Sequence, residues 1–116
     1  MTPDEAHARE VLVDRVAKLE AFGSADQIRD YFVQEQVVGQ PCKRNACVVA
    51  RYLAREIEAE LGGRWVTSVD GALISLSQSQ DDLYAVGGAT STPPAILELI
   101  KNFDGRRYPE LESHDD

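Results

Sequence analysis

The residues best suited to chemistry are two cysteines in the segment from residue 40 to residue 57, QPCKRNACVVARYLAREI. Cys42 and Cys47 lie in the loop and first turn that open a predicted amphipathic helix. A helix start collects unpaired N–H groups and the positive end of the helix dipole, which favour thiolates and bound anions. The same segment carries a group of polar and cationic side chains: Lys43, Arg44, Asn45, Arg51 and Arg55. We therefore expect any functional site to lie here.

Thiol chemistry is one interpretation of this segment. Arg44 and Arg51 flank Cys47 by about one turn on each side, so the sequence predicts a lowered pKa for the Cys47 thiol. Cys42 would then be the resolving thiol of a reversible disulfide. A nucleophilic cysteine enzyme also needs a base and an oxyanion hole, and spacing identifies no base. The interpretation that we favour makes Cys47 a half-buried core residue and Cys42 a loop thiol.

Metal and cofactor chemistry are not expected. Structural zinc sites usually need four ligands, whereas the chain has only two cysteines, and its histidines, His7 and His114, lie near the two ends. The glycine-rich motifs of dinucleotide and phosphate binding are absent from the sequence. The sequence therefore predicts no cofactor and no metal.

The cationic side chains support a binding interpretation. They lie on a chain with a formal net charge of −8, and guanidinium groups beside helix N–H groups bind phosphate or carboxylate. The leading hypothesis is a small non-enzymatic binding or regulatory module, in which the surface around residues 42–55 contacts a protein partner or a small anionic ligand. The alternative function is a thiol or redox protein centred on Cys47 and Cys42. The cationic side chains also have a purely structural interpretation, in which they form a solvated face of the helix.

A nucleic-acid interface is a further alternative. Two helices followed by a hairpin are typical of the winged helix-turn-helix, in which the second helix enters the major groove. Three features count against it: the acidic net charge, the long turn over residues 39–45, and a single basic residue in the predicted wing over residues 64–77.

Hydrophobic periodicity predicts three helices in the first half of the chain. The first spans about residues 3–21, the second begins after a cap at Ser24, and the third spans about residues 46–61 with Asn45 as its cap. Val37 and Val38 would pack as an apolar exit from the second helix, followed by a loop over residues 39–44. The pair of glycines at 62 and 63 should end the third helix.

The period then changes to that of strands. Asp70-Gly71 between two β-prone runs, residues 64–69 and 72–77, predicts a hairpin, and residues 83–86 predict a third strand that ends at a turn over residues 87 and 88. A last helix starts at Thr92-Pro93 and ends at Gly105. The predicted fold is α+β in the order α-α-α-β-β-β-α, an antiparallel meander with helices on one face. An open edge at residues 83–86 would allow a homodimer.

Length and composition predict one domain over residues 1–116, with residues 112–116 as a disordered acidic tail. The N-terminus has no basic region followed by an apolar core, and no apolar run approaches the ~18 residues of a membrane span. We therefore expect a soluble cytoplasmic protein with no membrane contact and with reduced thiols.

Two segments resemble small uncharacterised proteins of high-GC actinobacteria: CVVARYL, residues 47–53, and FDGRRYPEL, residues 103–111. In that group a cysteine-containing loop precedes a helix of the same kind, strands follow, and a late helix leaves through a similar Tyr-Pro-Glu-Leu segment. The resemblance spans roughly residues 24–111. It implies a shared compact fold and brings no activity and no catalytic residue with it.

Overall fold

The computed structural model describes residues 3–43, 45–70, 73–77 and 86–113. It contains, in chain order, α1 (Pro3–Glu20), α2 (Ala25–Gln34), α3 (Val48–Leu61), β1 (Val66–Asp70), β2 (Leu73–Ser77), β3 (Val86–Ser91), α4 (Pro94–Asp104) and the 3-10 turn η1 (Pro109–Leu111). The strands form an antiparallel sheet in the order β1-β2-β3. The predicted α+β class and element order are confirmed. No helix in the described ranges is long and apolar enough to cross a membrane.

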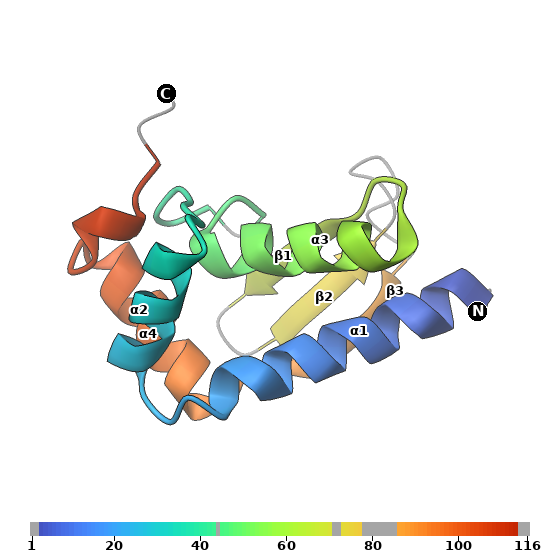
Figure 1. Ribbon diagram of the computed structural model, residues 1–116, viewed down its shortest axis with the longest axis horizontal. Coiled ribbons are helices and arrows are strands. Elements are labelled where there is room, and N and C mark those ends of the chain that lie inside the picture. Colours follow the sequence, from blue (N-terminus) through green and yellow to red (C-terminus); the bar gives the residue numbers. More distant parts are fainter. Residues whose placement is uncertain (1–2, 44, 71–72, 78–85, 114–116) are drawn as a thin grey trace.

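Helices α1 and α3 cover one face of the sheet (Figure 1). The buried strand positions alternate and supply the sheet's side of the core: Thr67, Val69, Ile74 and Leu76. Alternation of this kind places every second side chain on the helix-covered face. At one end of this layer α2, α4 and η1 pack against one another.

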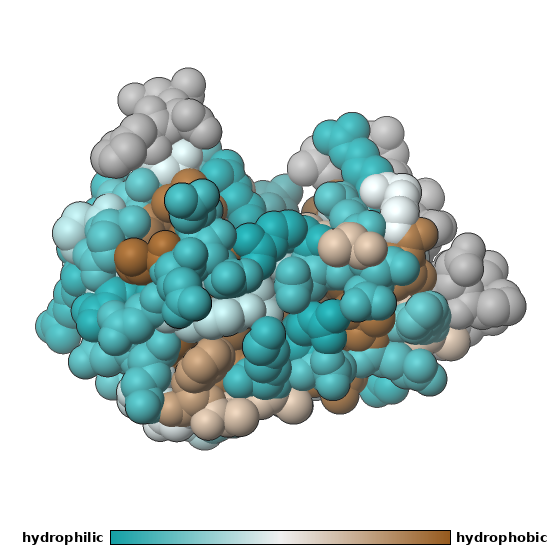
Figure 2. Space-filling view, viewed as in Figure 1, coloured by the Kyte–Doolittle hydropathy of each residue, from teal (hydrophilic) through white to brown (hydrophobic). Residues whose placement is uncertain are grey.

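The outer face of the two long helices is largely hydrophilic (Figure 2). Arg15 of α1 links the two helices there, because its guanidinium group lies 3.1 Å from the carboxylate of Glu56 and 3.0 Å from that of Glu60. Most of the large apolar side chains of both helices, among them Leu12 and Leu53, turn inward and are buried, whereas Val13 of α1 is 40% exposed. Each helix is therefore amphipathic in the way that the sequence period indicates.

Local signals set several helix ends as predicted. The Ser24 hydroxyl accepts a hydrogen bond from the Gln27 N–H at 3.3 Å and caps α2. Gly62 and Gly63 end α3 with φ angles of 73° and 76°, in the left-handed region that glycine adopts without steric cost. The C-cap of α4 is Gly105.

Four boundary expectations are corrected. Val37 is buried, but Val38 is 37% exposed, so only the first of the two valines packs onto the core. Asp70, predicted to lie in the hairpin turn, pairs with Leu73 and is the last residue of β1. Residues 71 and 72 lie outside the described residues. The third strand covers residues 86–91 and so lies later in the chain than the predicted strand over residues 83–86. Residues 83–85 lie outside the described residues. The glycines at 87 and 88 belong to β3, because backbone pairing with β2 continues through them.

The end of the chain is paired with the loop after α2. Gly39 forms a parallel bridge with Glu112; its N–H donates to the Leu111 carbonyl at 2.9 Å, and its carbonyl accepts from the Ser113 N–H at 2.8 Å. Glu112 also pairs with Arg106 at 2.8 Å. Residues 112 and 113, which we expected in a disordered tail, are therefore held by backbone hydrogen bonds, and residues 114–116 lie outside the described residues.

Gly39 also lies directly against the start of α3. A Cβ atom at this position would lie 2.7 Å from the Val48 Cα and closer still to the Val48 backbone nitrogen. Real Cβ atoms do not approach backbone this closely, so only glycine fits without moving the loop away from α3. The contact places the loop that carries Cys42 beside the start of α3.

The segment after α4 is fixed by the hydroxyl group of Tyr108, a side chain that is 4% exposed. This hydroxyl donates to the Asp26 carboxylate of α2 at 2.8 Å and accepts from the Asn102 amide of α4 at 3.1 Å. The Arg29 guanidinium group lies 5.3 Å from the Tyr108 ring centroid. The Tyr108 ring and Leu111 pack back onto the protein.

We predict that Tyr108→Phe lowers the free energy of unfolding by about 1.5 kcal/mol, because a hydroxyl that binds a carboxylate is lost from a buried position. Urea denaturation measures the change. In an Asp26→Ala background the same substitution should cost about half as much, since its charged partner is already gone. Equal unfolding midpoints for Tyr108→Phe and the parent protein would contradict this role.

Candidate functional site

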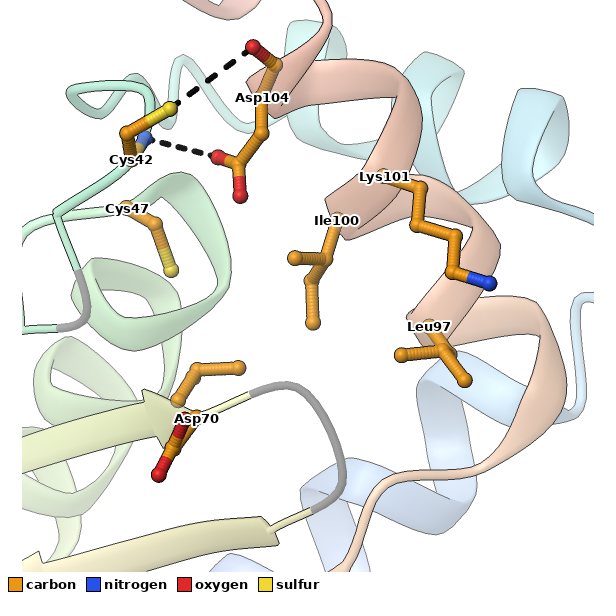
Figure 3. Close-up of a pocket in the computed structure, with 8 residues that line it drawn as sticks. Cys42, Cys47, Asp70, Leu97, Ile100, Lys101 and Asp104 are labelled. Carbon is orange, nitrogen blue, oxygen red and sulfur yellow. Dashed lines mark hydrogen bonds between the residues drawn. The ribbon is translucent and has the colours of Figure 1, made fainter.

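The loop between α2 and α3 folds onto itself and contacts the end of α4. The Gln40 N–H donates to the Ala46 carbonyl and the Cys47 N–H to the Lys43 carbonyl, both at 2.8 Å. Cys42 has a left-handed backbone with φ of 62°, and its N–H donates to the Asp104 carboxylate at 2.8 Å. Its thiol lies 3.9 Å from the Asp104 carbonyl oxygen (Figure 3). One aspartate at the C-terminal end of α4 therefore holds the exposed cysteine.

Cys47 is a structural thiol that caps α3. Its sulfur accepts a hydrogen bond from the Ala50 N–H at 3.4 Å, and the residue is only 3% exposed. Burial raises the pKa of this thiol above its ordinary value, outweighing the backbone hydrogen bonds that favour the thiolate. The predicted lowering of the Cys47 pKa is therefore wrong. The predicted cap was wrong as well, because Asn45 is exposed and α3 begins after Cys47.

The start of α3 faces the protein interior. Val48, Val49 and Ala50 are each at most 1% exposed, and the backbone of Gly39 lies against Val48. An external anion therefore has no open path to the first turn of this helix, which the sequence had suggested as an anion site.

One of the cationic residues of the predicted surface, Arg55, already contacts other groups of the protein. The Arg55 guanidinium group donates to the backbone carbonyl and to the carboxylate of Glu35, both at 3.2 Å. The guanidinium carbon lies 5.5 Å from the Tyr52 ring centroid. Lys43 is exposed and Arg51 is half-buried, and neither forms an ion pair with another described residue. Arg44 lies outside the described residues. Of the expected cations, Arg55 is thus already occupied by an intramolecular partner.

A pocket of about 340 Å³ lies beside the loop and brings together segments that are far apart in the sequence (Figure 3). The described residues that line it are Cys42 and Cys47, Val69 and Asp70 at the end of β1, and Leu97, Ile100, Lys101 and Asp104 of α4. The pocket combines an apolar wall with two cysteines and the Asp104 carboxylate, whereas the side chains of Asp70 and Lys101 lie at its rim and point away from it (Figure 3). It is the place where both predicted cysteines meet other polar groups.

The charges around the pocket are not paired with one another. One oxygen of Asp104 accepts from the Cys42 N–H, while the other points toward the pocket in Figure 3. The Lys101 side chain points away from both aspartates, and neither Asp104 nor Asp70 forms an ion pair within the described part of the chain. The Asp104 carboxylate therefore lies at the edge of an apolar wall with no cation of the described residues bound to it, whereas Asp70 is exposed and its carboxylate points away from the pocket (Figure 3).

Sequence reasoning placed Cys42 and Cys47 at the site but missed the residues opposite them. Asp104 is 62 positions from Cys42, and its neighbour Gly105 indicated only the end of a helix. Asp70 was assigned to a turn. Local spacing carries no signal for a contact of this kind, because the sheet and α4 create it.

The geometry of α3 differs from that of a recognition helix. Six of its residues are buried, and the Thr67 hydroxyl of β1 donates to the Ala50 carbonyl beneath the helix. The β1–β2 hairpin therefore packs under α3 and does not extend beside it as a wing.

Neither a metal-binding cluster in the described residues nor a known relative indicates what the site binds. Among the described residues no group of three or more histidine, cysteine or acidic side chains is arranged to hold a metal ion. Comparison of the chain with protein-family models, with curated proteins and with solved structures finds no match. The function therefore has to be argued from the site itself.

We predict that Cys47→Ala destabilises the protein by about 1 kcal/mol or more, because the Ala50 N–H loses its acceptor and a buried sulfur is removed. Cys47→Ser should retain more of the stability, since a serine hydroxyl caps helices well. Asn45→Ala is the matched control and should leave the unfolding midpoint almost unchanged. A loss for Asn45→Ala as large as that for Cys47→Ala would show that the cap is misassigned.

The two thiols should also differ in reactivity. We expect an aromatic disulfide reagent to modify Cys42 in the folded protein and to reach Cys47 only as the chain unfolds, because Cys47 is buried and its pKa is raised. Residue-resolved mass spectrometry with and without urea measures both rates. Rapid modification of Cys47 in the native protein would contradict the assignment.

Proposed function

We propose that this protein is a small binding module, and that its site is the pocket formed by the loop over residues 39–47, the end of β1 and α4. The observation that carries the proposal is the convergence of three separate segments on one concave, mixed apolar and charged surface. Ligand sites are typically concave, mostly apolar and equipped with a few placed polar groups. The proposal keeps Cys42 and Cys47 from the predicted surface. It replaces the predicted cationic residues of α3, Arg51 and Arg55, with residues of α4 and β1.

Thiol catalysis is less well supported by the same geometry. Cys47 caps a helix and is buried, and the Cys42 thiol faces a backbone carbonyl oxygen. A nucleophilic thiol needs a base that removes its proton, and neither of these contacts provides one. Binding requires only the surface that the pocket presents.

The test is a screen of small charged and neutral fragments against the labelled protein by amide NMR. We predict saturable shifts for residues that border the pocket, concentrated at residues 42–47, 69–70 and 97–104. Leu97 is half-buried and forms part of the wall, so Leu97→Trp should fill the pocket and abolish the shifts. Leu73→Trp is the matched control, because Leu73 is 47% exposed on β2 and does not line the pocket.

The comparison is valid only if both variants keep the unfolding midpoint of the parent protein. We expect them to do so, because Leu97 is half-buried and Leu73 is exposed. If no fragment of any charge shifts the pocket residues, or if Leu97→Trp binds as the parent does, the pocket is not the binding site.

A further inference from the structure

We infer that the pocket takes a cationic group on an apolar stem, an alkylammonium ion such as a primary amine or the side chain of a lysine. This inference rests on the proposed function and names the chemistry of its ligand. It is carried by the combination of the Asp104 carboxylate, which forms no ion pair with another described residue, with an apolar wall inside one small pocket. Neither the carboxylate nor the wall would be sufficient alone.

Asp104 is held in a fixed position. Its carboxylate accepts from the Cys42 N–H at 2.8 Å, so one oxygen is oriented by the loop. The other oxygen points toward the pocket between Cys47 and Ile100 (Figure 3). A carboxylate that is already positioned loses little side-chain freedom when it binds a cation.

The wall beside this carboxylate is apolar. Ile100 points into the pocket from α4 (Figure 3), and Val69, near the end of β1, also lines it. Ile100 and Val69 are 8% and 5% exposed, so the wall is rigid core, with Leu97 at its edge. A volume of about 340 Å³ is at the small end of the range for ligand pockets and suits a short alkyl chain with one head group.

The remaining charge does not compete for this position. Lys101 is exposed and its ammonium group points away from Asp104, so it contributes to the rim and leaves the Asp104 carboxylate open. The chain as a whole has a formal charge of −8, which attracts cations to it at long range. Among the described residues that line the pocket, an anionic ligand would meet the Asp104 carboxylate and gain only the ammonium group of Lys101.

The experiment titrates the protein with n-hexylammonium, n-hexanol and n-hexanoate at equal ionic strength, followed by amide NMR at the pocket residues. We expect hexylammonium to bind most tightly, and butylammonium more weakly by roughly threefold for each methylene removed. Asp104→Asn should weaken hexylammonium about fivefold, because the amide oxygen still accepts from Cys42 while the charge is gone. Asp30→Asn is the matched control, since it removes an equal charge from an exposed position of α2 outside the pocket.

A second titration distinguishes the two sources of this chemistry. N-acetyl-lysine N-methylamide carries the lysine side chain on a blocked backbone, and tighter binding than hexylammonium would identify a protein segment as the partner. Tighter binding of the free amine would identify a small molecule, and both results support a cationic ligand.

The inference is overturned if hexanoate or hexanol binds as tightly as hexylammonium, or if Asp104→Asn and Asp30→Asn have equal effects. Binding of hexanol or hexanoate alone would leave the pocket as a binding site and reject only its cationic ligand. No shift with any probe would reject the proposed function as well.

Discussion

The close approach of Gly39 to the start of α3 is the contact on which the rest of the site depends. Its backbone lies against Val48, where no Cβ fits, and both of its hydrogen-bonding groups are used by residues 111 and 113. The loop after α2 is thus enclosed between a helix start and the end of the chain. Because the loop is fixed at this point, the Cys42 N–H reaches the Asp104 carboxylate. The loop then forms the side of the pocket that carries Cys42 and Cys47.

The same contact determines the chemistry of the two cysteines. An open helix start with cations beside it would stabilise a thiolate, but the start of α3 is covered, and Cys47 is a neutral cap inside the core. Desolvation outweighs the backbone hydrogen bonds and reverses the direction of the pKa shift. What remains accessible is the pocket beside the loop, where Asp104 supplies charge and α4 supplies apolar surface. The binding function that we propose rests on these residues.

The parts of this structure that are predictable from the sequence are those with local causes. Ser24 and Gly62 set helix ends through their own side chain or backbone, and the hydrophobic period indicates the face of each helix. The third strand was placed too early, since its glycines resemble a turn until the pairing with β2 is known. The contact between Cys42 and Asp104 joins positions 62 residues apart and has no local pattern. The sequence thus predicts the elements and one side of the pocket, but not the opposite side.

The most direct test is the stability and loop protection of Gly39→Ala, compared with Gly105→Ala. At Gly105 a Cβ would meet its nearest backbone oxygen at 3.2 Å, so a small adjustment accommodates it, whereas at Gly39 the chain has to separate from α3. We predict that Gly39→Ala lowers the unfolding free energy by at least ~2 kcal/mol more than Gly105→Ala does, and that amide exchange accelerates at residues 47–50 and 111–113. Equal stability and unchanged exchange in both variants would contradict the account.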